Sequence, residues 1–474
     1  MSWLILLGCT DDQAEAEISE PQPPNIILIV ADDLGWADVS TYGLDRVPTP
    51  NIDRIAEQGV AFTHGYVSSP ACAPSRAALM TGQYPQSFGF EYNMFPQDGT
   101  RGLALDRITM ADALKAEGYE TALIGKWHQG VTDAHYPTER GFDEFYGFLS
   151  GTTTYVAVDT PGIVNAKPEQ APETEPRDEA SALYTGADKV RVENFDQYLT
   201  SELTREAANY VRRDRDQPFF LYLAHHAPHR PFQAPQAYYD RFDHIEDHDR
   251  RVYVAMIAAM DDGIGELLDA LEEAGQSDNT MVVFLSDNGC PARFEVCDCS
   301  ARINGGKFTH LEGGIRVPFM MSWPAGLNPQ GRVDTPVTAL DLYPTFLAAA
   351  GEEEMPERLA GLDLVAALQD DTRDEIAARS LFWRQRPVSV IRQGDWKLVQ
   401  VDGEVSGEET DSLTLFNLSE DPDELNNRAP EFPERAATMQ AELSNWSAQQ
   451  AEPSWPKFLT REVNVCGRAT QAVY

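Results

Sequence analysis

Continuous runs of apolar residues recur along the chain, each followed by turn-forming residues or by a segment with helical spacing. Five runs have strand length and no alternation with polar residues: NIILIV (25–30), TALIG (121–125), PFFLYLA (218–224), MVVFLS (281–286) and VPFMMSW (317–323). A strand that is apolar at every position is typically buried on both faces. The pattern therefore predicts an α/β fold with a large central sheet, mainly parallel or mixed, flanked by helices.

Helical spacing of apolar residues follows or precedes several of these runs. It predicts helices over 49–59, 109–118, 201–213 and 252–275, the last ended by Gly275. Residues from about 159 to 188 are rich in Pro, Glu and Ala with little periodicity, which indicates an inserted loop. After about Ala377, shorter runs predict antiparallel hairpins. We therefore expect a leader (1–24), an α/β domain (25–376) and a small C-terminal α+β subdomain with an antiparallel sheet (377–474).

Charge and cysteine content narrow the function classes. The 474 residues include 37 Lys and Arg against 76 Asp and Glu, a net charge of −39 that disfavours nucleic acid as a partner. The N-terminal LLGC, ending in Cys9, resembles a bacterial lipobox, which implies a lipidated Cys9, a polar tether and attachment to the membrane. An exported protein, periplasmic or anchored at the outer membrane, is one interpretation. A misassigned start codon or a chance apolar start is the other, because no Lys or Arg precedes the apolar run.

Four further cysteines fit export to an oxidising compartment. Two disulfides with three connectivities are open to Cys290, Cys297, Cys299 and Cys466. A zinc site is the alternative, but the single residue between Cys297 and Cys299 is shorter than the spacing of structural zinc ligands.

Chemically reactive side chains cluster just after the apolar runs, where parallel strands would bring them to one crevice. They are Asp32, Asp33, Lys126, His128, His229, Asp287 and Asn288. The four Asp and Asn side chains offer oxygen ligands, which favour Ca²⁺ or Mg²⁺. A single such pair more often makes a turn or a helix cap, but two pairs that each end a buried strand favour a metal.

A set of basic residues accompanies these ligands. Arg76, Lys126, His128, His229 and Lys307 lie at strand or motif ends of an acidic chain, which indicates a local positive pocket for an anion. Taken alone, each is more often a solvated or structural group.

The stretch SSPACAPSRAALMTG (68–82) sets Cys72 at the start of a predicted helix, near Arg76. Both features favour an anion there, so a thiolate nucleophile is one interpretation. The Cys-x₅-Arg phosphatase loop is excluded, because the sixth residue after Cys72 is Ala78.

Cys-x-Pro-Ser-Arg is instead the signature of the type I sulfatases, of the alkaline phosphatase-like superfamily, and the chain resembles that family from about residue 25 to 427. The supporting segments occur in order: NIILIVADDLGW, CAPSRAALMTGQYP, GYETALIGKWHQG, APHRP, LSDNG, GGKFTHLEGGIRVP and LFNLSEDPDELNN. Gln83 stands where the family more often has a basic residue, and RINGGK departs from the usual PLRGGK.

The resemblance implies that a maturation enzyme oxidises Cys72 to formylglycine. It also implies a metal site of Asp32, Asp33, residue 72, Asp287 and Asn288, and a catalytic set of Arg76, Lys126, His128, His229, Lys307 and Asp287. We expect an exported enzyme that hydrolyses an aryl sulfate or a sulfated carbohydrate. A phosphodiester or phosphonate hydrolase and a non-catalytic binder of sulfated glycans are the alternatives. Candidate sugar contacts, each of which could equally be a packing residue, are Glu91, Tyr92, Asn93, His226, His310 and Trp383.

Overall fold

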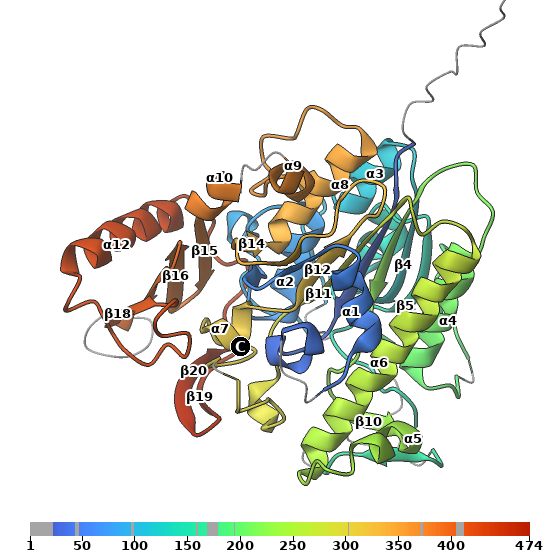
Figure 1. Ribbon diagram of the computed structural model, residues 1–474, viewed down its shortest axis with the longest axis horizontal. Helices are drawn as coiled ribbons and strands as arrows, with labels where there is room; N and C mark the ends of the chain where they lie inside the picture. Colours follow the sequence, from blue (N-terminus) through green and yellow to red (C-terminus); the bar gives the residue numbers. More distant parts are fainter. Residues whose placement is uncertain are drawn as a thin grey trace, which may run out of the picture.

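A computed structural model gives the arrangement of the chain (Figure 1). It describes residues 22–42, 47–95, 99–157, 160–167, 179–193, 195–301, 303–369, 373–403 and 412–474. The expected leader falls almost entirely outside these residues, as do Cys9 and part of the insert at 159–188. Among the described residues, no helix combines the length and apolar character needed to cross a membrane.

The predicted central sheet is present and, within the described residues, has ten strands. In spatial order they are β13 (Gly331–Val333), β2 (Val60–Phe62), β12 (Phe319–Ser322), β11 (Thr280–Ser286), β1 (Asn25–Ala31), β9 (Phe219–Ala224), β4 (Glu120–Lys126), β5 (Glu144–Phe148), β7 (Tyr184–Thr185) and β8 (Val190–Arg191). The central strands β11, β1, β9, β4 and β5 are parallel, whereas β12 is antiparallel to β11. The five apolar runs lie in β1, β4, β9, β11 and β12, so the predicted mixed sheet is confirmed.

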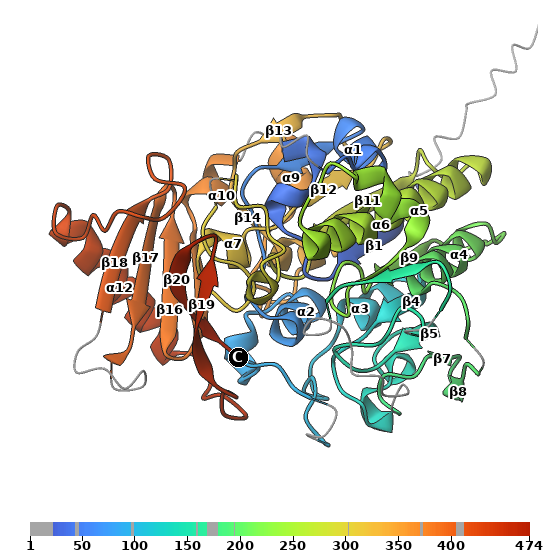
Figure 2. The same cartoon turned by 90° about the horizontal axis from the view of Figure 1, so that it is seen from below.

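Helices cover both faces of this sheet, which explains the continuous apolar runs (Figures 1 and 2). On one face lie α1 (Pro50–Glu57), α4 (Leu199–Val211) and α6 (His248–Glu273). On the other lie α2 (Cys72–Thr81), α3 (Met110–Ala116), α8 (Leu342–Ala350) and α9 (Leu364–Gln369). Along β1, Ile27 and Ile29 pack toward α6, while Leu28 and Val30 pack toward the second group. The four predicted helices are confirmed as α1, α3, α4 and α6.

The C-terminal region forms a second, smaller sheet, as predicted. Its antiparallel strands are β15 (Ser380–Gln385), β16 (Val388–Gln393), β17 (Trp396–Val401) and β18 (Ser412–Asn417). Helix α12 (Pro433–Ala448) packs on one face through Met439 and Leu443. The other face packs against α2, where Trp383 shares a core with Ala73 and Ala77. The division of the chain at residues 24 and 376 stays a prediction.

Short elements complete the fold, several in segments for which the sequence predicts none. They are β3 (Gly65–Tyr66), β6 (Ile163–Asn165), β10 (Gln233–Pro235), α5 (Gln236–Tyr239), α7 (Glu312–Ile315), β14 (Val337–Thr338), α10 (Arg373–Ala378), β19 (Thr460–Val465) and β20 (Arg468–Val473). Strands β6 and β7 lie in the described part of the predicted insert and pair with β10 and β5. Strands of two or three residues carry no readable periodicity, because their pairing comes from tertiary contacts.

Two disulfides are present within the described residues, and one of them holds the end of the chain against the central domain. Cys290 pairs with Cys297, and Cys299 pairs with Cys466 in the turn of the β19–β20 hairpin. The second bond joins segments 167 positions apart. These bonds correspond to one of the three connectivities that the sequence leaves open. All four cysteines are paired in them, so none has a free thiolate to bind zinc.

Candidate active site

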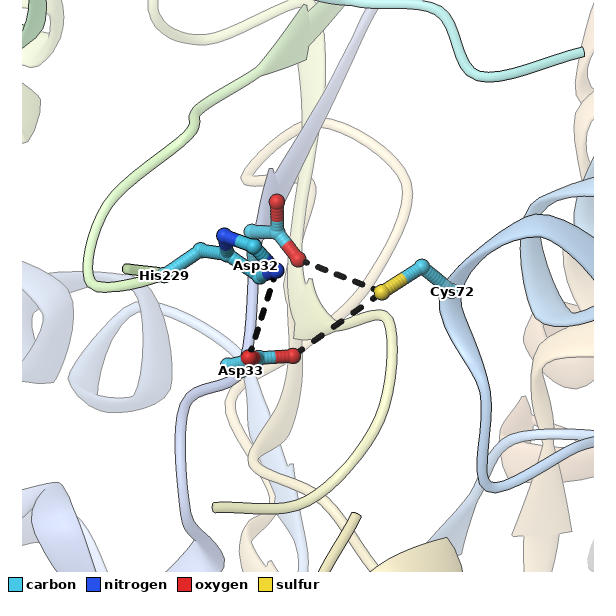
Figure 3. A group of neighbouring side chains, drawn as sticks. All are labelled: Asp32, Asp33, Cys72 and His229. Atoms are coloured by element: carbon cyan, nitrogen blue, oxygen red, sulfur yellow. Dashed lines mark hydrogen bonds and ion pairs between the residues drawn. The ribbon is translucent and has the colours of Figure 1, made fainter. Parts of the chain in front are cut away.

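Asp32 and Asp33 follow the C-terminal end of β1 and both face Cys72 (Figure 3). Their Oδ1 atoms lie 3.6 and 3.9 Å from the Cys72 Sγ atom. Neighbouring residues on a strand point to opposite faces, so this arrangement requires a turn. Asp33 makes that turn with a φ of 67°, in the left-handed region that only some non-glycine residues adopt. The backbone therefore brings two consecutive carboxylates to one point.

Cys72 is the first residue of α2 and is buried with a free thiol. Burial raises the pKa of this thiol, and the nearby ammonium groups of Lys126 and Lys307 only partly oppose that effect. The unmodified side chain is therefore a protonated thiol at neutral pH. Without modification, residue 72 is a weak nucleophile.

Two lysines neutralise the two carboxylates. Lys126 Nζ, at the end of β4, lies 2.6 Å from Asp32 Oδ2, and Lys307 Nζ lies 2.6 Å from Asp33 Oδ1. Burial alone would raise the pKa of Asp32, but Lys126 and the surrounding cationic groups hold it well below its usual value. Burial raises the pKa of Asp33, and Lys307 limits that rise.

Arg76 holds a third carboxylate, that of Asp287, which follows β11. Its Nε and Nη2 atoms are each 2.8 Å from Asp287 Oδ2, while Nη1 donates to the Tyr222 hydroxyl at 3.1 Å. The other oxygen of Asp287 accepts a hydrogen bond from the backbone N–H of Asp33 at 3.2 Å. Burial, reinforced by the charge of Asp32, raises the pKa of Asp287 to about 6. A carboxylate with this pKa can accept a proton near neutral pH.

Three histidines lie around the same centre. His229 Nε2 is 3.6 Å from Asp33 Oδ2, and His226 Nδ1 is 3.3 Å from Asp32 Oδ2. His128 Nε2 is bonded to the Met94 carbonyl oxygen at 3.2 Å. Burial lowers the pKa of all three, that of His226 to about 4. Each imidazole is therefore neutral at pH 7 before an anion binds.

The oxygen-rich centre fits a hard divalent cation. Ligand atoms of Asp32, Asp33, Cys72 and His229 lie within 4.8 Å of one another. Within the described residues, the Asn288 Oδ1 atom is buried and has no hydrogen-bond donor, while its Nδ2 donates to Asp33 at 2.8 Å. A buried acceptor without a partner is costly, and a cation would satisfy it. Three aspartates balance Arg76, Lys126 and Lys307, so a divalent ion would leave the centre positive enough to hold an anion.

A cavity of about 490 Å³ opens above this centre. Its inner part is lined by Asp33, Cys72, His128, His229 and Lys307. Its outer part includes Asn93, Phe95, Arg230, Arg293, Phe294, Phe308, Phe458, Arg461 and Tyr474. The volume is in the range of pockets that hold small ligands, with polar groups at the base and aromatic groups above.

The structure brings together every residue that the sequence analysis assigned to the metal and catalytic sets, but it scatters the candidate sugar contacts. Of these, Asn93 lines the cavity, and its Oδ1 accepts a hydrogen bond from the Ala73 backbone. Glu91 is instead buried against Arg384, and Trp383 Nε1 donates to the Val67 carbonyl. The others do not line the cavity: Tyr92 donates to the Arg386 carbonyl, His226 contacts Asp32, and His310 is buried near Lys397.

Several residues beside the catalytic centre or in the cavity escaped the sequence analysis. Tyr222 lies in an apolar run, where its hydroxyl gives no signal of the bond to Arg76. Arg293, Arg461 and Tyr474 come from segments without a recognisable motif, and they are brought together by the long-range disulfide and by the packing of β19 and β20 against Ala292.

Comparison with known proteins agrees with these observations. The family profile described as Sulfatase matches residues 24–352, and that of N-sulphoglucosamine sulphohydrolase, C-terminal, matches 306–449. Human arylsulfatase A is 31% identical over 86% of this chain and 84% of its own length. Mouse steryl-sulfatase is 32% identical over 74% of this chain, which spans 66% of that relative. The crystal structure of Ps i-CgsB superposes with a TM-score of 0.82 at 36% identity, covering 92% of this chain and 95% of that one, and another structure of it holds k-i-k-neocarrahexaose.

Proposed function

The chain belongs to the sulfatase family of sulfuric ester hydrolases, and from this premise we propose that it removes sulfate from a sulfated carbohydrate. The observation that carries the proposal is the convergence of three carboxylates, two lysines and an arginine on residue 72 at the base of an open cavity. Ps i-CgsB, whose fold is similar to that of this chain, has been crystallised in complex with k-i-k-neocarrahexaose. That likeness supports an oligosaccharide as substrate.

The nucleophile is residue 72 in the matured form. A formylglycine made from Cys72 would supply a hydrated aldehyde there, and Ca²⁺ or Mg²⁺ held by Asp32, Asp33, Asp287 and Asn288 would polarise the sulfate. Asp287, with its raised pKa, accepts the proton of the attacking hydroxyl. Arg76 fixes Asp287 in position through two contacts to one carboxylate oxygen.

Basic groups stabilise the charge that develops on the sulfate and on the leaving oxygen. Lys126 and Lys307, which pair with Asp32 and Asp33, bind sulfuryl oxygens. His229 lines the inner part of the cavity, where it donates a proton to the departing sugar oxygen. Its imidazole is neutral until the anionic substrate arrives, because that charge raises the pKa that burial has lowered. His128 assists release of sulfate from residue 72.

We further propose that the enzyme is exported. Its disulfides fit an oxidising compartment, and lipidation of Cys9 would tether it to the bacterial membrane, with the periplasm or the outer membrane as its location. A formylglycine-generating enzyme is then the partner that it needs before or during export.

A direct test compares two substrates. Enzyme coexpressed with a formylglycine-generating partner should show a higher kcat/KM for 4-nitrocatechol sulfate than for bis(4-nitrophenyl) phosphate, with Ca²⁺ present in both assays. The reverse order would favour the phosphodiester hydrolase. Tight binding of sulfated glycan without sulfate release, together with an unmodified Cys72, would favour the non-catalytic binder.

A further inference from the structure

The outer cavity has a charge opposite to that of the chain. Acidic residues outnumber Lys and Arg by 76 to 37 overall. Among the described residues that line this cavity, Asp33 has the only acidic side chain, whereas Arg230, Arg293, Lys307 and Arg461 are basic. Lys307 and Asp33 already pair at the catalytic centre. The three arginines are therefore an excess of positive charge, and an acidic protein that concentrates positive charge in one hollow attracts anions there.

These arginines have no carboxylate partner within the described part of the chain. Arg230, Arg293 and Arg461 are exposed, and their guanidinium groups form no ion pair with a described Asp or Glu. Arg230 and Arg293 lie against the same ring, with their Cζ atoms 5.7 and 5.6 Å from the Phe294 centroid. Partial burial lowers the pKa of Arg230 and the like charge of Arg293 lowers it further, while the charge of Asp33 acts in the opposite direction. Two neighbouring cations that form no ion pair with a described carboxylate favour an anionic ligand.

Tyr474 connects this positive group to the catalytic centre. Burial raises the pKa of its hydroxyl, while the charges of Arg293, Arg461 and Lys307 act to lower it, so all three cations lie around this residue. The Tyr474 ring contacts the Phe308 ring at 4.2 Å between centroids. Because Lys307 also binds Asp33, the arginines lie beside the reaction centre rather than at a remote surface.

The mouth of the cavity also carries exposed aromatic rings and a hairpin fixed by a disulfide. Phe458 is 71% exposed beside the cavity and faces Phe95 at 5.7 Å between ring centroids. Exposed aromatic rings at a pocket mouth mark a ligand contact. Arg461 lies in β19, and the Cys299–Cys466 disulfide joins this hairpin to the loop that carries Arg293. A rigid support of this kind keeps recognition groups in place.

We propose that Arg293 and Arg461, with Arg230 beside them, bind a second anionic group of the substrate, a sulfate ester or a uronate carboxylate on the sugar next to the one that loses sulfate. The enzyme then prefers oligosaccharides with at least two anionic groups over singly sulfated ones. This inference rests on the proposed function, since it assumes that the sulfate to be removed lies at residue 72.

The test measures binding, so that it does not depend on turnover. Calorimetry on the full-length Cys72→Ala protein with Ca²⁺ compares a neocarrabiose sulfated on both sugars with the same sugar carrying one sulfate. A chondroitin disaccharide with one sulfate and one uronate carboxylate gives the third arm. We expect the dianionic sugars, or one of them, to bind about ten- to a hundredfold more tightly than the singly sulfated one.

The arginines are then tested by substitution in the same background. Arg293→Gln with Arg461→Gln should reduce that preference to near unity. Arg332→Gln, which removes an exposed arginine of β13 outside the cavity, should leave it intact. The inference is overturned if the Cys72→Ala protein with all its arginines binds neither dianionic sugar more tightly than the singly sulfated one. It is also overturned if the double arginine variant keeps the full preference. Sulfate release from 4-nitrocatechol sulfate by matured enzyme tests the proposed function separately, and either result can fail without the other.

Discussion

The Cys72→Ser variant is expected to lose at least about a thousandfold in sulfate ester turnover, because its hydroxyl allows the first half of the reaction only. A serine at position 72 lies at the same helix start, beside Asp32 and Asp33, and can attack sulfur. The serine sulfate that forms has no second hydroxyl on the same carbon, so it cannot expel the sulfate. Intact protein mass after incubation with substrate should show the addition of one sulfuryl group.

Cys72→Ala is the matched control for this experiment. It removes the nucleophile without changing the backbone of α2, so it should be equally inactive but gain no mass. Turnover by Cys72→Ser within tenfold of the matured enzyme would contradict the assigned role of residue 72. A mass gain in the alanine variant would show that sulfate attaches elsewhere.

Lys397→Met is expected to reduce the free energy of unfolding by about 3–5 kcal/mol, the usual loss when one partner of a buried charge group is removed. Lys397 lies in β17 with a fully buried Nζ atom, 3.0 Å from Glu312 Oε1 and 2.8 Å from Glu424 Oε1. Glu424 Oε2 in turn accepts a 2.6 Å hydrogen bond from the Glu312 backbone N–H. Without the ammonium group, two buried carboxylates would face each other.

This charge group joins the C-terminal sheet to α7 of the central domain, so we expect its loss to destabilise the whole chain. Glu312 begins α7, shortly after Lys307, whereas Lys397 belongs to the C-terminal sheet. Chemical denaturation followed by tryptophan fluorescence measures the change. Lys115→Met is the control, because Lys115 pairs with Asp143 at 2.6 Å but both side chains are largely exposed. It should cost less than about 1 kcal/mol, and a similar loss in both variants would refute the role of burial.

The sequence predicts the central part of the fold because local pattern and tertiary environment agree there. Strands β1, β9 and β11 read as continuous apolar runs, since Ile27 packs on one face of the sheet and Leu28 on the other. The polar residues that follow these runs reach one crevice because parallel strands end at the same edge. The proximity of Asp32 and Asp287 can therefore be predicted once β1 and β11 are recognised as parallel strands of one sheet.

The outer cavity and the interface between the C-terminal sheet and the central domain depend on contacts that no local sequence pattern encodes. Arg293 and Arg461 are brought close by the pairing of Cys299 with Cys466, one of three connectivities that the sequence allows, and by the packing of Val463 against Ala292. The partners Glu312 and Lys397 are likewise far apart in the chain. Charged residues are usually exposed, so the sequence gives no sign that these two are buried together. Two of the sugar-contact candidates lie outside the cavity for the same reason. Glu91 accepts hydrogen bonds from Arg384 of the C-terminal sheet, and Trp383 of that sheet donates to the Val67 carbonyl.

The most direct test of a catalytic centre built on residue 72 relates activity to its chemical state. Protein is produced with graded amounts of a formylglycine-generating enzyme, and peptide mass gives the aldehyde fraction at position 72 of each preparation. Sulfate release from 4-nitrocatechol sulfate should rise in proportion to that fraction and extrapolate to zero for the unmodified thiol. Equal release from preparations that contain only cysteine at this position would contradict the account.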